Sequence, residues 1–397
     1  MSAVQFDNVD ILFGRRRNEA LALIDQGRTR DEILASTNVV LGAAGICLRV
    51  EAGEICVLMG LSGSGKSTIL RAINGLNKVA RGRMLIEHNG AQIDVATCAP
   101  TQLRMLRTKR IAMVFQQFAL LPWRTVGENV ALALELQGRP KPEIETIVRE
   151  KLAMVGLTNW AGKFAHELSG GMQQRVGLAR AFATDADILL MDEPFSALDP
   201  LIRHRLQDEL LLLQKEMKKT IIFVSHDLNE ALKLGNHIAI LDGGRIVQAG
   251  TAEDILLRPA NDYVAEFVKH MNPLDVLRGS ALMRPAAKLS FAGQEVLLDG
   301  AGRARLQLDA DGRPTGCTFD GETRRLALSD GEYTPSGVVA HVIVAPIDLK
   351  MRAAIELRRY SENPIVLVDQ LGRLAGLCGD EEIFSALLQR RKSLSGK

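Results

Sequence analysis

A glycine-rich stretch directly after a run of apolar residues constrains this chain more than any other feature. Residues 60–67 have the spacing G-x-x-x-x-G-K-[ST], and residues 55–59 before them are all apolar. In this pattern a buried strand delivers a loop whose backbone N–H groups surround phosphate oxygens, and the next helix directs its positive end at them. The sequence therefore predicts a nucleotide site formed by Gly60, Leu61, Ser62, Gly63, Ser64, Gly65, Lys66, Ser67 and Thr68.

Two side chains of this phosphate loop have expected roles. Lys66 brings positive charge to the β and γ phosphates, and the hydroxyl of Ser67 is placed to bind Mg²⁺. A glycine-rich turn with an accidental lysine is the alternative. The apolar strand before the loop and the helix expected to begin near Gly65 favour the nucleotide site.

Length and composition limit the class of protein. The 397 residues suffice for two or three domains, and the 49 Lys and Arg residues nearly balance the 47 Asp and Glu, which does not favour a nucleic-acid partner. The five cysteines include no C-x-x-C pair and are typical of core residues in a reducing compartment. We find no signal peptide and no run near the roughly 18 apolar residues of a spanning helix. We expect a soluble chain that reaches a membrane only through a partner.

Apolar runs alternate with amphipathic helical patterns over residues 55–267, which predicts an α/β domain with a mostly parallel central sheet. The clearest strands are 111–115, 188–191, 220–224 and 237–241. Between them a helical stripe, expected to be buried, is formed by Leu206, Leu210, Leu213 and Met217. Residues 18–40 predict a short helical insertion with a capping box from Thr29 to Glu32. A surface embellishment is an equally good interpretation of it.

The chain changes character after Asn272-Pro273, where short strands and glycine-rich hairpins replace long helices, so we predict domains at 1–272 and 273–397. Residues 306–316 recur as 366–376. The matching positions are Asp309 and Asp369, Gly312 and Gly372, Arg313 and Arg373, and Gly316 and Gly376. The tail is therefore predicted to hold two copies of one small α/β unit, the first more degenerate.

Two carboxylates follow another buried strand. Residues 188–191 lead into Asp192 and Glu193. Because side chains alternate along a strand, the two carboxylates point in different directions. We assign Asp192 to Mg²⁺ and Glu193 to polarising the attacking water. A solvated acidic turn is the weaker alternative beside a phosphate loop.

A second anion-binding helix end is predicted at residues 168–175. Ser169 suits the N-cap of a helix that runs through residue 183, and Gly170 and Gly171 let the backbone approach an anion. The chain has no second phosphate loop. The simplest interpretation is that this helix end serves the nucleotide of another copy.

Over roughly residues 50–270 the chain resembles the ATPase subunit of an ABC transporter. The motifs that carry the resemblance follow in order: the phosphate loop, Gln116, residues 168–172, Asp192-Glu193, residues 196–199 and residues 225–227. The resemblance implies a P-loop ABC ATPase domain with a mixed central sheet and a helical subdomain. It also implies a head-to-tail homodimer that holds two ATP molecules, each between one phosphate loop and the other subunit's signature helix.

The same resemblance implies residue roles. Gln116 would bind the metal and the water and link ATP to the membrane subunits. Ser169, Gly170 and Gly171 would contact the partner's γ-phosphate, Asp199 would act across the dimer interface, and His226 would contact the γ-phosphate. Phe13 is the candidate for the aromatic residue that stacks on adenine.

Within this family the chain resembles ATPases of quaternary-amine importers. Four features carry this resemblance: the insertion after Phe13, Met172 in place of a common glutamine, residues 118–122 and the repeated tail. These importers handle glycine betaine, choline or proline betaine, and Trp123, where betaine members often have histidine, favours choline. The resemblance implies integral membrane permease subunits, an extracytoplasmic solute-binding protein and a peripheral place on the cytoplasmic face of the membrane.

The tail resembles a tandem pair of CBS domains, and nucleotide binding there and a structural or dimerising role both stay open. Two alternatives for the whole chain also stay open. One is an importer ATPase for another small solute such as an amino acid. The other is a soluble ABC ATPase, which the single phosphate loop and the lack of sustained heptads disfavour.

Overall fold

The computed structural model describes residues 2–269, 272–293, 295–324, 326–329, 342–385 and 387, and the side chains of residues 213 and 275 are outside the description. Internal contacts divide the chain into two units, Met1–Ala252 and Glu253–Lys397. The division falls earlier in the chain than the boundary after residue 272 that the change in sequence character suggests. Each unit has its own sheets, and we describe each by itself.

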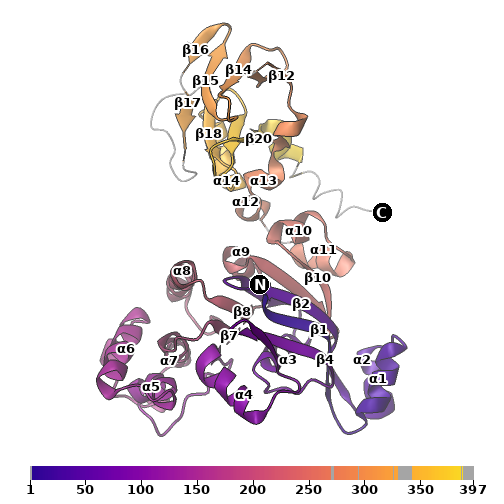
Figure 1. Cartoon of the computed structure of the whole chain (residues 1–397), viewed down its shortest axis with the longest axis vertical. Helices are drawn as coiled ribbons and strands as arrows, with labels where there is room; N and C mark the ends of the chain where they lie inside the picture. The colour runs from indigo at the N-terminus through magenta and orange to yellow at the C-terminus, as the bar shows by residue number, and fades with distance from the viewer. Residues whose placement is uncertain are drawn as a thin grey trace. The chain divides into compact units, whose positions relative to one another are not determined.

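A six-stranded sheet forms the centre of the first unit (Figure 1). Its strands lie in the order β10-β9-β3-β8-β7-β6, and each neighbouring pair is parallel except β10 with β9. The strands are β3 (Ile55–Met59), β6 (Ile111–Val114), β7 (Ile188–Asp192), β8 (Thr220–Val224), β9 (His237–Asp242) and β10 (Arg245–Gly250). The predicted mixed α/β sheet is confirmed, and the strands read from apolar runs end within one residue of their observed ends.

An antiparallel sheet in the order β2-β1-β4-β5 makes a second layer. It consists of β1 (Ser2–Phe13), β2 (Val40–Glu51), β4 (Arg81–His88) and β5 (Ala91–Asp94). Helix α3 (Lys66–Ile73) follows the phosphate loop and buries Ile69 and Ile73 in a core that takes side chains from both sheets, such as Ile46 and Leu58. This packing fixes the start of α3 at the end of β3.

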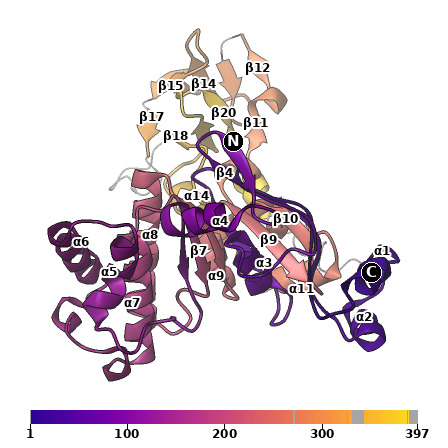
Figure 2. The same ribbon diagram turned by 60° about the horizontal axis from the view of Figure 1, so that its bottom comes forward.

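A group of helices forms a subdomain beside the central sheet, as Figure 2 shows for α5, α6 and α7. Its elements are α4 (Pro100–Met105), the π-helix Leu106–Arg110, α5 (Val126–Leu136), α6 (Lys141–Met154), the 3₁₀ turns Thr158–Trp160 and Ala165–Glu167, and α7 (Gly170–Ala183). Thr125 caps α5 by accepting a hydrogen bond from the Glu128 amide. The helical subdomain expected from the resemblance is thereby confirmed.

Helices α8 (Pro200–Met217) and α9 (Leu228–Leu234) flank β8 in the sequence. The predicted stripe on α8 is only partly correct. Leu206 and Leu210 are buried, but Met217 is 50% exposed, and the Leu213 side chain lies outside the described residues. The helix ends at Met217 and the chain reverses at Lys218 in a left-handed conformation, so the last turn extends beyond the core.

The predicted insertion consists of two helices, α1 (Arg17–Asp25) and α2 (Arg30–Thr37). The capping box forms as expected: the Thr29 hydroxyl accepts from the Glu32 amide, and the Glu32 carboxylate accepts from the Thr29 amide. Ile24 and Ile33 pack in a small core with residues of β1 and β2. The insertion is therefore anchored to the antiparallel sheet.

The second unit begins with four short helices, α10 (Ala252–Leu257), α11 (Asp262–Val268), α12 (Pro273–Val276) and α13 (Gly279–Leu282). One sheet has the order β11-β20-β19-β18-β17 and the other β12-β13-β14-β15-β16. Their strands are β11 (Arg284–Pro285), β12 (Phe291–Ala292), β13 (Glu295–Leu297), β14 (Ala304–Leu308), β15 (Pro314–Phe319), β16 (Glu322–Arg324), β17 (Leu326–Leu328), β18 (Val342–Pro346), β19 (Ile365–Val368) and β20 (Leu374–Cys378), with the 3₁₀ turn Ala286–Lys288 and helix α14 (Met351–Arg358). The later copy is a β-α-β-β unit from β18 to β20. The earlier copy, from β13 to β15, has no helix between β13 and β14.

The repeated motif forms two hairpins with matching turns, β14-β15 and β19-β20. In each turn one aspartate oxygen accepts two backbone N–H groups, from residues 311 and 313 at Asp309 and from residues 371 and 373 at Asp369. The following glycines, Gly312 and Gly372, have φ of 80° and 78°. The repeat in sequence is thus a repeat in backbone geometry.

The two turns also contact each other. The Leu374 amide donates to the Gly312 carbonyl at 2.9 Å, and Arg313 Nε donates to the Leu371 carbonyl at 3.0 Å. Pro314 occupies the position that corresponds to Leu374 and has no N–H to donate. The backbone hydrogen bond between the copies therefore has no counterpart in the opposite direction.

Candidate nucleotide-binding site

The phosphate loop has a backbone that only glycine can supply. Gly60 and Gly65 have φ of 139° and 99°, and a Cβ on them would lie 2.2 Å from the Leu241 carbonyl oxygen and 2.4 Å from that of Gly42. Within the described part of the chain, the Ser64 hydroxyl is buried without a hydrogen-bond partner. A cradle of close backbone with an unsatisfied polar group fits a phosphate.

Lys66 is held inside this loop. Its ammonium group donates to the carbonyls of Gly60 at 2.9 Å and Leu61 at 2.8 Å. Burial lowers the pKa of Lys66, while the carboxylates of Glu193 and Asp192 act in the opposite direction. An ammonium group has three N–H donors, so the third remains for an anion in the cradle.

The loop opens onto a cavity of about 360 Å³. The lining residues come from β1, α2, β2, the loop, α3 and the ends of β6, β7 and β8: Phe13, Arg30, Val40, Gly42, Ser62, Gly63, Gly65, Lys66, Ser67, Thr68, Gln116, Glu193 and His226. A larger cavity of about 870 Å³ lies between α5 and α6, but its lining contains no residue of the loop. The smaller cavity is therefore the candidate site.

Asp192 lies beneath the cavity with a side chain that is completely buried. One of its oxygens accepts from the Ser67 hydroxyl at 2.7 Å, and the other pairs with Arg71 at 2.8 Å. The two predicted metal ligands thus adjoin each other. Sequence reasoning missed Arg71, although its place four residues after Ser67 on α3 puts both on one helix face.

Glu193 lies close to the two other predicted catalytic residues, Gln116 and His226. Its carboxylate accepts from Gln116 Nε2 at 3.2 Å and lies 3.6 Å from His226 Nδ1. Its φ of 50° is uncommon for a residue that is not glycine. This backbone turns the carboxylate of Glu193 into the cavity, whereas Asp192 stays buried in the strand.

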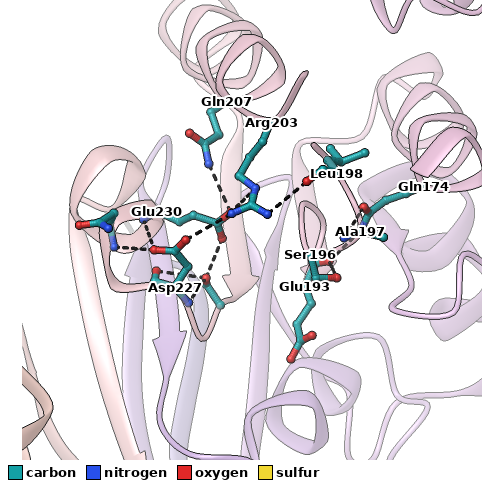
Figure 3. A network of polar contacts seen from close by, with 11 residues as sticks. Gln174, Glu193, Ser196, Ala197, Leu198, Arg203, Gln207, Asp227 and Glu230 are labelled. Atoms are coloured by element: carbon teal, nitrogen blue, oxygen red, sulfur yellow. Dashed lines mark hydrogen bonds and ion pairs between the residues drawn. The ribbon is translucent and has the colours of Figure 1, made fainter. Parts of the chain in front are cut away.

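Gln174 of α7 supports the backbone on both sides of this turn (Figure 3). Its amide nitrogen donates to the Glu193 carbonyl at 3.0 Å, and its amide oxygen accepts from the Ala197 N–H at 3.0 Å. The side chain is 1% exposed. Helix α7 and the segment after β7 are therefore joined by one buried amide, which the sequence analysis did not identify.

A second part of the network joins the segments after β7 and β8 (Figure 3). Arg203 of α8 donates to the Leu198 carbonyl at 3.2 Å and to Asp227 at 3.4 Å. Glu230 accepts from Ser225 at 2.7 Å and from Gln207 at 3.3 Å. Burial raises the pKa of Glu230, against the opposing effect of the Ser225 hydrogen bond. The segment that carries His226 is thus tied to the residues before Asp199.

The remaining predicted residues lie away from the cavity. Ser169 is the N-cap of α7 and accepts from the Met172 amide at 3.4 Å, and Asp199 is the N-cap of α8. Both are exposed, as is Gly170, and none of them nor Gly171 lines the cavity of their own chain. Phe13, in contrast, does line it: the ring is 42% exposed and lies over Gly42, where an added Cβ would approach it to 2.7 Å.

Comparison with known proteins places this geometry in a family. The family model described as ABC transporter matches residues 44–196. The chain is 47% identical over 281 residues to the glycine betaine/proline betaine transport system ATP-binding protein ProV of Escherichia coli, which covers 71% of this chain and 69% of that protein. This chain belongs to the ABC transporter ATP-binding proteins.

Two further relatives of this ABC transporter ATPase extend the comparison. The glycine betaine/carnitine transport ATP-binding protein GbuA of Listeria monocytogenes is 45% identical and covers 71% of this chain and 70% of its own. The glycine betaine transport ATP-binding protein OpuAA of Bacillus subtilis is 38% identical over 389 residues, 97% of this chain and 92% of its own. The likeness to OpuAA therefore continues through the tail.

Among solved structures, the dimeric post-hydrolysis state of the ATP-binding cassette MJ0796 bound to ADP and Pi superposes with a TM-score of 0.54 and 31% identity. It covers 62% of this ABC transporter ATPase and 98% of the cassette. The part of the chain that the structure describes contains no helix long and apolar enough to cross a membrane.

Proposed function

We propose that this ABC transporter ATPase hydrolyses ATP with Mg²⁺ and thereby powers import of a quaternary amine, choline or glycine betaine. Permease subunits in the membrane would carry the solute, an extracytoplasmic binding protein would deliver it, and the chain would lie on the cytoplasmic face. The observation that carries the proposal is the likeness to the glycine betaine ATPase OpuAA over almost the full length of both chains. Exposed Trp123 remains the feature that favours choline.

Residues of the cradle would bind the triphosphate. Lys66 keeps its two bonds to loop carbonyls and offers its third N–H to a phosphate oxygen. The loop amides and the start of α3 add positive potential, and the exposed ring of Phe13 offers a stacking surface for adenine. The cavity lining thus offers both an aromatic and a cationic contact.

Ser67 and Asp192 would hold Mg²⁺, with Gln116 as a further ligand. Their oxygen donors suit this ion, and the Ser67 hydroxyl and Asp192 already lie 2.7 Å apart. The described residues contain no group of three or more His, Cys, Asp or Glu side chains able to hold a metal. The ion would therefore need phosphate oxygens and water as well, and when bound it neutralises charge on the transferred phosphate.

Glu193 would polarise the attacking water. Gln116 donates to one carboxylate oxygen of Glu193, and His226 lies near the other. These contacts fix the carboxylate and leave acceptor sites on both oxygens for the water. His226 and Gln116 would then complete the position of the water opposite the phosphate that Lys66 contacts.

Ser169, Gly170, Gly171 and Asp199 would act on the nucleotide of a second copy. They do not line the cavity of their own chain, and three of them are exposed at helix starts. The dimeric MJ0796 cassette supports this homodimer. In the same proposal residues 273–397 form a degenerate CBS-like regulatory pair, for which the matching turns at Asp309 and Asp369 are the support.

Reconstitution tests the proposal. The chain, its permease and its binding protein are placed in vesicles, and ATP hydrolysis and uptake are measured with choline, glycine betaine and an amino acid such as methionine. We expect a quaternary amine to stimulate both activities and to enter only with ATP and Mg²⁺. Stimulation by the amino acid alone would contradict the substrate class, and a chain that binds ATP but no membrane subunit would contradict the transport role.

A further inference from the structure

Arg30, at the start of the inserted helix α2, contacts the phosphate loop. Its guanidinium Nη1 donates to the Gly63 carbonyl at 2.5 Å, and the side chain lines the same cavity as Lys66 and Phe13. The two residues of the bond are 33 positions apart in the sequence. The insertion therefore reaches the site that the family motifs form, rather than only decorating the surface.

The position of Arg30 is fixed by the residues around it. The capping box between Thr29 and Glu32 defines the first turn of α2, and Ile33 is completely buried against β1 and β2. A side chain on an anchored helix start loses little freedom when it binds. Arg30 is thus held at the edge of the cavity before any ligand enters.

The charge of Arg30 is available there. A guanidinium group has five N–H donors, and the Gly63 carbonyl accepts from one of them. No ion pair joins Arg30 to a carboxylate among the described residues, whereas nearby Arg28 pairs with Glu32 at 3.3 Å. A half-buried cation without a carboxylate beside a phosphate loop is suited to bind a phosphate group.

We propose that Arg30 is a nucleotide-binding residue that contacts the phosphate chain, so that the inserted helices form part of the ATP site. The inference rests on the proposed function. It adds a cation from outside the phosphate loop, whose contribution grows with the number of phosphates on the nucleotide. Its bond to Gly63 also holds the loop in the binding conformation.

The test is equilibrium binding of ATP, ADP and AMP to the full chain and to its Arg30→Ala and Arg30→Lys variants, with a chelator present so that ATP is not consumed. We expect Arg30→Ala to weaken ATP binding roughly tenfold, the effect of losing a hydrogen bond to a charged group. ADP should lose less, and AMP less than about threefold. Arg30→Lys keeps the charge and should retain most of the affinity for ATP.

Arg28→Ala is the matched control, because Arg28 lies two residues away, is exposed and does not line the cavity. It should bind all three nucleotides like the wild type. Equal losses for ATP, ADP and AMP in Arg30→Ala, or no loss for any, would overturn the proposal and leave the Gly63 bond as a structural contact. If the wild type itself binds no ATP, the proposed function fails first, and this outcome is distinct from the other two.

Discussion

Glu193 lies where the turn after β7, the segment after β6 and the segment after β8 meet. Its replacement by glutamine preserves the size of the side chain and its contacts but removes the negative charge that would polarise water. We expect Glu193→Gln to bind ATP normally while hydrolysis falls by at least ~10²-fold. Phosphate release and nucleotide binding measure the two effects. The exposed Glu150 on α6 gives a control, since Glu150→Gln should hydrolyse ATP like the wild type.

Gln174 gives a second prediction at this scale, because its hydrogen bonds join backbone groups on both sides of the turn. Gln174→Ala removes its bonds to Glu193 and Ala197. We expect the turnover rate to fall roughly tenfold, since a displaced carboxylate loses alignment, with little change in ATP affinity. Gln137→Ala is the control, because Gln137 donates to the Thr108 carbonyl. Normal turnover of Gln174→Ala would show that the turn at Glu193 holds without this amide.

Glu230 makes stability depend on pH. Burial raises its pKa in the folded chain above the ordinary 4.5. At a pH between the unfolded pKa and the raised folded pKa, the folded chain therefore binds more protons than the unfolded chain. Stability contributed by this group is therefore lost as pH rises through that window. We expect the melting temperature of the wild type to fall more from about pH 5 to about pH 8 than that of Glu230→Gln. Identical pH profiles would contradict this assignment.

The residues that sequence reasoning found share one property, and those that it missed share another. Residues 60–68 follow one buried strand and Asp192-Glu193 another, so each group is predicted by its place directly after an apolar run. Gln174 bonds backbone groups of a distant segment, and Arg203 bonds the side chain of Asp227, 24 residues away. Nothing in the sequence near either residue indicates these contacts. Arg30 was hidden in the same way, because its partner Gly63 is near only after the sheets have formed.

At the scale of elements, local signals gave accurate bounds. The buried strands and the capping box of α2 depend on neighbouring residues, and both were predicted. The stripe on α8 was wrong at Met217 because periodicity cannot tell where a helix leaves the core. The lack of a helix between β13 and β14 could not be predicted from the repeat, because the repeat matches only residues 306–316 and 366–376.

The repeated hairpins offer a matched pair of variants. Arg313 donates across to the Leu371 carbonyl, whereas Arg373 Nε donates to Asp369 in its own turn. We expect Arg313→Ala to increase hydrogen exchange in both hairpins, including the Leu374 amide, by several-fold, since the contact between them weakens. Arg373→Ala should affect residues 365–378 alone. Hydrogen exchange followed by mass spectrometry measures both, and equal patterns would contradict the cross-contact.

At the scale of the whole molecule, the proposed homodimer places the exposed N-caps at Ser169 and Asp199 against the nucleotide of a second copy. We expect Glu193→Gln with ATP and Mg²⁺ to elute at twice the mass of the chain without nucleotide. Slow hydrolysis would preserve the sandwich, that is, the head-to-tail homodimer with two ATP molecules between its subunits. Adding Ser169→Arg should return it to the smaller mass, since a bulky cation would occupy the partner's phosphate position. Light scattering on the eluted peak measures the mass, and a single mass in all conditions would contradict the sandwich.

Pro314 has a consequence for the symmetry of the tail. The Leu374 amide of the later hairpin donates to the earlier one, and Pro314 has no N–H to form the equivalent bond in return. The two turns are therefore not interchangeable, although their aspartates make the same bonds. A tail built from two later hairpins would form this backbone hydrogen bond in both directions. A tail built from two earlier hairpins would not form it at all.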